Sequence, residues 1–589
     1  MKNSNAGQKT LGKEFLPATQ EEMKALGWKR PDIVLVTGDA YIDHPSFGVA
    51  IIGRWLEAHG FKVAILAQPK YQDESDFKRF GKPRLFFGIS SGNLDSIVAN
   101  YTGNARIRQK DAYSPDGDPY FPGPRTKTNR RRPDRAVITY ANLARRAYPD
   151  IPIVLGGIEA SLRRFIHYDY QQEKLRNSIL TDSKADILVF GMGERTIVEI
   201  ARRLTNGQNL LGIPGTCTRH GKTSLQIQNL YYLPSWTQIQ KDNSLFLDAE
   251  LKIDEFARSG QDVALVQEQK GGTFVVQNPP AKPLSTKEMD RIYGLPFTRM
   301  PHPNFGRVPA WEMIKDSITV VRGCSGNCSF CAIARHQGPV VTSRSIDSIL
   351  EEIDTLTKLP TFKGTISDLG GPTANLYGVS CKISYKCKKK DCLFPAPCKN
   401  LALNEERFRQ LLKAAKARKG VKRVFVSSGL RMELLLKTPA LLRDILESHT
   451  PGSLKIAPEH TEEEVLMLMH KPGAMVLNEF LKKARAILKN MGKKKEITAY
   501  FMTSHPGCTL SHMQAMKNRL KKMHLPVRQF QDFTPTPGTI STAMYVCGLD
   551  RYNKKPIFVP RKRGQRLAQR KILESLMKPS KGQRPDVQA

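Results

Sequence analysis

The sequence predicts an α/β protein in which a doubly wound parallel sheet is followed by a partial barrel of six βα repeats. Short apolar runs alternate with helix-like segments over two separate stretches of the chain, and most of these runs end in glycine or polar residues. Continuous apolar runs of this length are typical of strands that are covered on both faces, as the strands of parallel sheets are. The chain of 589 residues is long enough for several domains with cores of their own.

Five strand candidates lie in the first stretch, at residues 31–39, 61–69, 83–90, 151–157 and 185–194. The segment 47–60 is helix-like and ends at a glycine. This alternation predicts a Rossmann-like N-terminal domain over residues 1–205. Ligands of such sheets bind at the carboxyl ends of the strands, where this chain carries Gly38-Asp39, Gly156-Gly157 and Gly191-Met192-Gly193-Glu194. Glycines are also common there because tight turns need them.

Residues 206–310 break this rhythm and are expected to form a connecting subdomain, with one strand pair around DVALVQEQ and GGTFVVQNP. The alternation returns from Trp311, and residues 311–545 are predicted to form the barrel. Its strand candidates are SITVVRG, GTISDLGG, RVFVSSG, SLKIAPE, EITAYFMTS and VRQFQDFTP. In such barrels the active site lies at the carboxyl ends of the strands. Residues 546–589 are basic and are expected to form a partly loose tail.

The charge is unusual, because 92 lysines and arginines face 55 acidic residues and give a formal net charge of +37. Such an excess is typical of proteins that bind RNA or another polyanion, but a solvated basic surface without a ligand explains it equally well. No apolar run approaches the ~18–20 residues that cross a bilayer, and the first residues show no signal peptide. We therefore expect a cytoplasmic protein with no membrane segment.

Seven of the ten cysteines fall between residues 324 and 398, which indicates metal binding or catalysis more than a disulfide framework. Cys324, Cys328 and Cys331 form a C-x3-C-x2-C motif directly after a predicted strand. Three thiolates on one loop can hold three irons of a cubane cluster and leave the fourth iron open, whereas a closed structural site uses four protein ligands. The alternative is a zinc site that takes its fourth ligand from elsewhere, for example from His336.

The motif C-x3-C-x-aromatic-C, with Phe330 before the last cysteine and after the first strand of a six-repeat barrel, resembles that of the radical SAM (S-adenosylmethionine) superfamily. The resemblance implies a [4Fe–4S] cluster whose open iron binds the amino and carboxylate groups of SAM. It also implies reductive cleavage of SAM to methionine and a 5′-deoxyadenosyl radical, which abstracts hydrogen from an unidentified substrate. The implied electron donor is a reducing partner of the flavodoxin or ferredoxin type.

The order of motifs along the barrel agrees with this resemblance, which also implies a set of SAM-binding residues. They are Gly370, Gly371, Thr373, Ser428, Arg431 and Glu459. Gly370 and Gly371 stand where the superfamily has a Gly-Gly-Glu turn that receives the SAM amino group. Proline and threonine follow here instead of the acid, so Thr373 or Asp368 is expected to take its place. No catalytic side chain is assigned.

Five motifs, spread in order over nearly the whole chain, resemble those of the YgiQ-type radical SAM proteins. They are GDAYIDHPSFG, VLGGIEASLRR, SDLGGPTANLYG, KIAPEHTE and FTPTPGTISTAMYVCG. This resemblance supports the fold and the cofactors but names no substrate. His460, His505, Tyr500 and Tyr545 lie where they could face a substrate at the barrel mouth, although packing is the more frequent role of such residues.

A second group of cysteines, Cys381, Cys387, Cys392 and Cys398, lies within a lysine- and proline-rich segment. Tetrahedral sulfur ligation suits either an iron–sulfur cluster or a structural zinc ion. The spacing differs from the paired C-x2-C of zinc ribbons, which favours iron–sulfur, and the nearby lysines would favour thiolates. Partial ligation or redox-active thiols are the alternatives.

The N-terminal sheet resembles the cobalamin-binding domain that precedes many radical SAM barrels, through its GMGE turn and through His44 in DHPSFG. The D-x-H-x-x-G spacing of that domain is absent, and a histidine before a proline is more often structural, so bound cobalamin is not expected. Two other functions stay open: a cobalamin-dependent radical methylase, and a non-catalytic, metal-stabilised RNA-binding protein. A bound corrinoid would favour the first, and a zinc-only metal content would favour the second.

Overall fold

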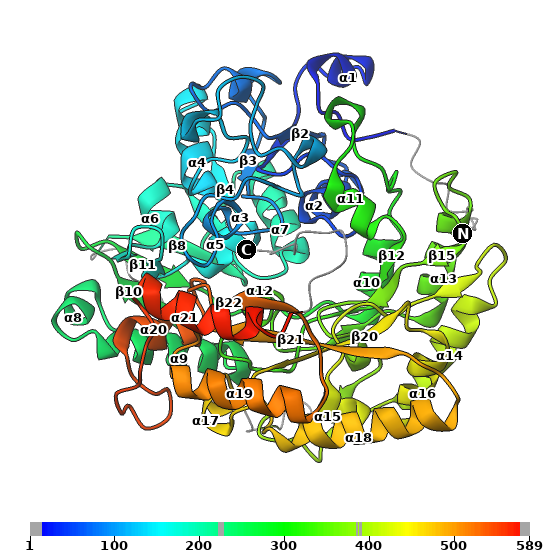
Figure 1. Ribbon diagram of the computed structural model, residues 1–589. Coiled ribbons are helices and arrows are strands. Elements are labelled where there is room, and N and C mark those ends of the chain that lie inside the picture. The colour runs from blue at the N-terminus through cyan, green and yellow to red at the C-terminus, as the bar shows by residue number, and fades with distance from the viewer. Residues whose placement is uncertain (1–13, 222–228, 384–386, 388–390, 578–589) are drawn as a thin grey trace.

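The computed structural model describes residues 14–221, 229–383, 387 and 391–577. Figure 1 shows an N-terminal sheet with its helices in blue and cyan above a barrel drawn from green to orange. The last helices, α20 (Ile540–Cys547) and α21 (Arg563–Glu574), are drawn in red and return to the junction of these two parts. No helix in the described part of the chain is long and apolar enough to span a membrane.

A nine-stranded sheet forms the core of the N-terminal part. Its strands in spatial order are β2 (Val63–Ala67), β1 (Ile33–Thr37), β3 (Phe86–Ile89), β4 (Ile153–Leu155), β7 (Ile187–Val189), β8 (Thr216–His220), β11 (Phe274–Gln277), β10 (Ala264–Glu268) and β9 (Leu230–Tyr232). The first five run parallel to one another, and β8 is antiparallel to β7. All residues of these five strands are buried, which confirms the predicted doubly wound parallel sheet.

Successive residues of β1 pack against helices on opposite faces of the sheet, as the alternation of side chains along a strand requires. Leu35 shares a core with α2 (Gly48–Glu57) and α7 (Glu194–Thr205). Val36 shares a different core with α4 (Ala136–Ala147). Because both faces are covered, a ligand can reach this sheet only at an edge or at the strand ends.

The connecting subdomain expected over residues 206–310 is not separate from the N-terminal domain, because β8, β11, β10 and β9 extend the same sheet. The sequence pattern missed this because β8 reads TCTRH and has no apolar run. Its place depends on backbone pairing with β7 and β11. The expected strand pair is confirmed, since β10 and β11 are antiparallel. The helices α9 (Ser244–Ser259) and α10 (Thr286–Tyr293) complete this segment.

All six predicted barrel strands are present. They are β12 and β13 (Ser317–Thr319 and Val321–Arg322), β15 and β16 (Thr365–Ile366 and Asp368–Gly370), β19 (Arg423–Val424), β20 (Ser453–Glu459), β21 (Glu496–Thr503) and β22 (Val527–Asp532). The pairs β12–β16, β15–β19, β20–β21 and β21–β22 are parallel. Within the described ranges no ladder joins β22 to β12, so the barrel is partial as predicted. Its outer helices are α13 (Ile346–Thr357), α14 (Glu405–Lys416), α16 (Pro439–Ser448), α18 (Met475–Asn490) and α19 (Leu510–Lys522).

The segment expected to be a loose tail, residues 546–589, folds back onto the barrel where the structure describes it. In α21, Leu573 is fully buried, and Gln569 makes hydrogen bonds of 2.8 and 2.6 Å to backbone groups in the loop after β21. Arg566 is also buried and donates to two backbone carbonyls. The sequence analysis did not predict this helix, because arginine and glutamine, which are usually exposed, form much of its buried face. Residues 578–589 lie outside the described part.

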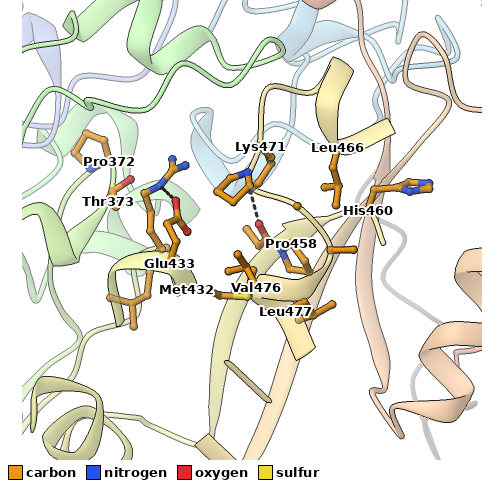
Figure 2. Close-up of a pocket in the computed structure, with 17 residues that line it drawn as sticks. Pro372, Thr373, Met432, Glu433, Pro458, His460, Leu466, Lys471, Val476 and Leu477 are labelled. Atoms are coloured by element: carbon orange, nitrogen blue, oxygen red, sulfur yellow. Dashed lines mark hydrogen bonds and ion pairs between the residues drawn. The ribbon is translucent and has the colours of Figure 1, made fainter. Parts of the chain in front are cut away.

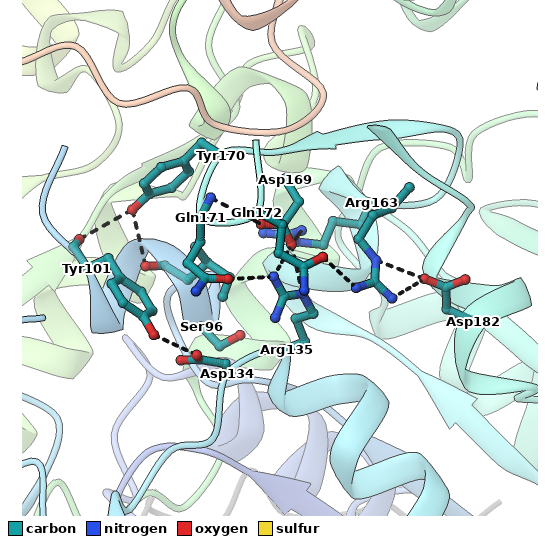
Figure 3. A network of polar contacts seen from close by, with 12 residues as sticks. Ser96, Tyr101, Asp134, Arg135, Arg163, Asp169, Tyr170, Gln171, Gln172 and Asp182 are labelled. Carbon is teal, nitrogen blue, oxygen red and sulfur yellow. Dashed lines mark hydrogen bonds and ion pairs between the residues drawn. The ribbon is translucent and has the colours of Figure 1, made fainter. Parts of the chain in front are cut away.

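A buried polar network holds the hairpin at residues 167–176 in place (Figure 3). Asp169 is fully buried and accepts a hydrogen bond from Arg135 Nε at 2.7 Å. Tyr168 of the same hairpin packs against Tyr545 of α20, with ring centroids 5.9 Å apart. By holding the hairpin in place, the network supports this contact between the N-terminal part and α20, the helix that follows the last barrel strand.

Candidate active site

The three cysteines of the C-x3-C-x2-C motif lie on one loop between β13 and α12 (Ala332–Gln337). Cys324 is buried, and Cys328 and Cys331 are half-buried. The Cys331 N–H donates to the Cys328 carbonyl at 3.1 Å, which turns the end of the loop back on itself. Gly323 has a φ of +77°, and a Cβ there would collide with a backbone oxygen. Glycine is therefore needed where the loop leaves the strand.

Binding of a [4Fe–4S] cluster by these three cysteines stays a prediction. Within the described ranges, no group of three or more histidine, cysteine or acidic side chains is arranged to hold a metal ion. His336 is engaged elsewhere, because its Nδ1 lies 2.9 Å from Ser161 Oγ. Burial and the neighbouring Cys328 raise the pKa of the Cys331 thiol to about 11, an effect that a bound cation reverses.

Asn327, between the first two cysteines, anchors the loop to its surroundings. Its side-chain amide donates to Asp254 of α9 at 2.9 Å and to Asp391 at 3.1 Å. Asp254 also pairs with Arg258 at 2.9 Å. Since Asp391 precedes Cys392, this contact brings the loop of the first cysteine group next to that of the second. Asn327 and Asp254 were not identified from the sequence.

The turn after the second barrel strand is tied down by Asp368. This carboxylate accepts hydrogen bonds from the N–H groups of Ser427 and Ser428 at 2.8 and 3.0 Å, and from the Ser428 hydroxyl. The Ser428 hydroxyl accepts in turn from the Gly371 N–H at 3.3 Å. A Cβ at Gly370 would collide with Ser428 Oγ. Asp368 therefore joins the turn to Ser427 and Ser428, and contacts of Asp368 and Ser428 with SAM stay predictions.

Thr373 and Arg431 both lie against the cysteine loop. Thr373 Oγ1 is 3.6 Å from Cys324 Sγ, and Arg431 Nη1 is 3.8 Å from Cys328 Sγ. Arg431 Nε donates to Glu433 at 2.5 Å. Although burial opposes its charge, Glu433 and the two cysteines raise the pKa of Arg431. The sequence analysis did not identify Glu433, which lies in α15 (Met432–Leu435), the short helix after β19; its position two residues after Arg431 is the signal that could have found it.

An open cavity of about 660 Å³ lies beside this pair (Figure 2). Its walls come from the ends of barrel strands and from the loop before α18, and its polar side chains include Thr373, Arg431, Glu433, His460 and Lys471. The Lys471 ammonium donates to a carbonyl of β20 at 2.6 Å. Two of the predicted SAM-binding residues line this cavity, together with Glu433 and Lys471, which the sequence analysis did not identify.

The other predicted residues lie near the barrel mouth in different settings. Glu459 ends β20 with a φ of +68°; burial raises its pKa, and its Oε2 has no partner in the described part of the chain. His460 lines the cavity, whereas His505 lies 2.7 Å from a serine hydroxyl of α20. Burial lowers the pKa of both histidines to about 3, so both are neutral. Tyr500 and Tyr545 are largely buried, and roles for them stay predictions.

The second group comprises Cys381, Cys387, Cys392 and Cys398. The Cys398 N–H donates to the Cys392 carbonyl at 2.8 Å. Burial raises the pKa of the Cys392 thiol, and the charges of the other three cysteines raise it further. Among the described residues no three of them are close enough to share a single ion. Residues 384–386 and 388–390 of this segment lie outside the described ranges.

A second cavity, of about 900 Å³, lies at the carboxyl edge of the N-terminal sheet. Its walls are mainly aliphatic side chains and glycines, and they include the expected strand-end turns at Asp39, Gly156-Gly157 and Gly191–Glu194. His336 of α12 lines it from the barrel side. His44 does not line it; burial lowers the pKa of this histidine, and its Nδ1 accepts a hydrogen bond from the Ser46 N–H at 3.1 Å. His44 therefore does not face this cavity, and a structural role for it stays a prediction.

Two family models cover most of the chain. The model described as radical SAM N-terminal matches residues 15–317, and the radical SAM superfamily model matches residues 318–520. Together with the cysteine loop at the mouth of a partial barrel, these matches define the class of protein: a radical SAM enzyme, whose class uses a [4Fe–4S] cluster and SAM.

Curated relatives show to which family within the radical SAM class the chain belongs. A UPF0313 protein of Thermotoga neapolitana is 47% identical over 563 residues, which cover 93% of this chain and 96% of that protein. A UPF0313 protein of Geobacter sulfurreducens is 45% identical over 566 residues, covering 95% and 92%. The chain belongs to the UPF0313 family of radical SAM proteins.

One solved structure shares the fold over most of its length. The radical SAM methyltransferase TsrM from Kitasatospora setae, solved with its tryptophan substrate and a SAM analogue, aligns over 93% of this chain and 89% of its own at a TM-score of 0.51. A second TsrM structure, with cobalamin and a [4Fe–4S] cluster bound, aligns at 0.49. At 14% and 13% identity these likenesses concern the fold alone.

Proposed function

We propose that this protein cleaves SAM reductively at a [4Fe–4S] cluster held by Cys324, Cys328 and Cys331, and that the radical formed abstracts hydrogen from its substrate. The observation that carries the proposal is the position of the cysteine loop beside the Arg431–Glu433 pair and its cavity. When bound, the cluster supplies the electron that splits SAM into methionine and a 5′-deoxyadenosyl radical. A reductant of the flavodoxin or ferredoxin type is part of the proposal.

The side chains of the cavity would position SAM and take no part in bond breaking. Glu433 is the acidic side chain that lines the cavity, so it can accept a hydrogen bond from the SAM amino group in place of the missing glutamate of the Gly-Gly turn. Arg431 can pair with the SAM carboxylate, because charge-assisted hydrogen bonds from a guanidinium hold carboxylates strongly. Thr373, beside Cys324, offers a hydroxyl to the same ligand. Aliphatic side chains form most of the remaining wall and exclude water.

The test uses protein purified without oxygen, reconstituted with iron and sulfide, reduced with dithionite and mixed with SAM. Mass spectrometry is expected to detect methionine and 5′-deoxyadenosine. Cys328→Ala is expected to lose this product together with the cluster absorbance. Cys217→Ala, at a buried cysteine of the N-terminal sheet, is the matched control and is expected to keep both. Intact SAM in the presence of a fully loaded, reduced cluster would contradict the proposal.

A cobalamin-dependent radical methylase is the second candidate function, and the cavity in the N-terminal sheet favours it. The cavity lies between the sheet and α12, the helix directly after the cysteine loop. Its glycine and aliphatic walls suit the benzimidazole end of cobalamin, and TsrM, which shares the fold, has been solved with cobalamin. The expectation that cobalamin is absent is therefore not confirmed.

Gly156→Leu tests this second function by filling the cavity. Gly156 lines it in an extended conformation, and a Cβ there would meet no atom within 4 Å, so the first carbon of a larger side chain has room. After incubation with hydroxocobalamin and desalting, wild type is expected to keep corrinoid absorbance and Gly156→Leu to lose it. Gly452→Leu, at an exposed glycine with equally open surroundings, is the control. Equal retention by Gly156→Leu, or no binding by wild type, would exclude this function.

Two further expectations belong to the proposal as secondary parts. The four-cysteine group is proposed to hold a second iron–sulfur cluster or a zinc ion, supported by the effect of the other three cysteines on the pKa of Cys392. RNA or another polyanion is proposed as a partner, supported by the net charge of +37. Neither is required for SAM cleavage, so each can fail without affecting the main proposal.

A further inference from the structure

A third cavity, here called the basic cleft, lies between the N-terminal part and α12 and encloses about 2490 Å³ of open space. It shares no lining residue with the cavity beside Arg431 and Glu433. Six cationic side chains line it against three acidic ones: Arg164, Arg195, Arg258, Lys282, Arg322 and Arg335, against Glu199, Asp254 and Asp262. Gly323 and α12, which flank the cysteine loop in the sequence, form one of its walls. A ligand in the basic cleft would therefore lie next to that loop.

Arg164 is the side chain in the basic cleft whose charge is least compensated. It is only 7% exposed, and its hydrogen bonds go to neutral oxygens, to Gln277 Oε1 at 2.6 Å and to the Ser161 carbonyl. No carboxylate contacts it within the described ranges, and burial lowers its pKa. Its Nη2 makes no hydrogen bond to any described residue, and Arg164 is one of the side chains that line the cleft. Burying a cation without a counter-charge is unfavourable, and an anionic ligand would relieve this.

Two neighbouring arginines add to the positive potential. Arg322 pairs with Glu194 and Arg335 with Asp254, but the Nη2 group of each is buried without an acceptor among the described residues. Glu250 is a further acid in this region. Burial raises the pKa of Glu250 to about 7, so its negative charge is only partly present at neutral pH. Arg195, Arg258, Arg322 and Arg335 are all ion-paired, with Glu288, Asp254, Glu194 and Asp254 respectively, so the uncompensated charge of the basic cleft lies mainly at Arg164.

We propose that the basic cleft binds a small anionic molecule through phosphate or carboxylate oxygens, with Arg164 as the principal contact. Planar guanidinium groups bind both kinds of oxyanion through paired hydrogen bonds. Phe190, whose ring centroid lies 5.1 Å from the Arg164 guanidinium, lines the cleft together with Phe256 and Met289. The ligand is therefore expected to carry an apolar or aromatic part as well. A phosphorylated molecule and a carboxylic acid share this chemistry, and the test separates them.

The experiment measures binding by isothermal titration calorimetry on the reconstituted protein, with pyrophosphate and malonate as separate probes. Arg164→Gln is expected to weaken binding of at least one anion by about tenfold or more, because hydrogen bonds to charged groups are the stronger ones. Arg164→Lys keeps the charge and is expected to retain most of the affinity. Arg443→Gln, at an exposed arginine of α16 on the outside of the barrel, is expected to bind like wild type.

The outcomes distinguish the ligand classes and can overturn the proposal. Binding of pyrophosphate alone identifies a phosphorylated ligand, and binding of malonate alone identifies a carboxylic acid. Equal affinity of wild type and Arg164→Gln for both anions, or no binding of either anion by wild type, overturns the proposal. Thermal unfolding and iron content, compared across the variants, show whether Arg164→Gln is folded. Because no SAM is present, the result does not depend on the proposed radical reaction.

Discussion

Replacing Arg431 with methionine removes the positive charge that lies against the cysteine loop. Its Nη1 is 3.8 Å from Cys328 Sγ, and its Nε donates to Glu433 at 2.5 Å. Methionine is unbranched and fills most of the same space, so the change removes charge and hydrogen bonds more than packing. It also leaves the Glu433 carboxylate, whose side chain is 7% exposed, without its cation.

Two effects of different size follow from this geometry. If Arg431 pairs with the SAM carboxylate, its loss removes an interaction of about 1.5–3 kcal/mol, which weakens SAM binding by roughly 10- to 150-fold. Removing one partner of a buried ion pair also costs about 3–5 kcal/mol of stability. The second effect is separable, because Glu433→Gln in the same chain removes the unpaired charge. We expect the double variant to recover stability but not SAM binding.

The assay follows the rate of 5′-deoxyadenosine formation against SAM concentration, with iron content and thermal unfolding measured on the same samples. Arg431→Met is expected to raise KM for SAM by about 10- to 150-fold. Arg443→Met, at an exposed arginine of α16, is expected to behave like wild type. An Arg431→Met protein that holds its full iron content and keeps the wild-type KM would show that Arg431 does not bind SAM.

Three further predictions concern other parts of the molecule. Cys392→Ala is expected to lower the metal content, measured by mass spectrometry, by one cluster or one zinc ion per chain, whereas Cys547→Ala leaves it unchanged. Burial raises the pKa of Glu250 from 4.5 to about 7, so the folded protein favours the protonated carboxyl group. As the pH rises between these values, wild type is therefore expected to lose up to about 3 kcal/mol of stability relative to Glu250→Gln. Parallel melting curves of the two proteins from pH 4 to 8 would contradict this. Gln569→Ala leaves two buried backbone groups unpaired and is expected to lower the free energy of unfolding in urea by about 2–6 kcal/mol. Arg563→Ala, at an exposed residue of the same helix, is expected to have little effect. Equal urea midpoints for the two variants would count against the docking of α21.

The candidate site divides into a part that the sequence could predict and a part that it could not. The C-x3-C-x2-C spacing lies within eight residues of one loop, so it was visible without any knowledge of the fold. The hydrogen bonds of Asp368 could not be predicted, because its carboxylate accepts them from Ser427 and Ser428, which follow the next strand. Glu433 was overlooked for the related reason that its importance comes from its contact with Arg431 and from the cavity that both line.

The parallel sheet, the six barrel strands and the cysteine loop could all be predicted from the sequence, because each depends on a pattern within about ten consecutive residues. The extension of the N-terminal sheet by β8 to β11 and the docking of α21 on the barrel became visible only in the folded chain. The same holds for the polar groups that meet. Arg566 contacts the Gly103 carbonyl across 463 positions in the chain, and Arg322 pairs with Glu194 across 128. Such contacts arise from the packing of whole elements, which local periodicity does not encode.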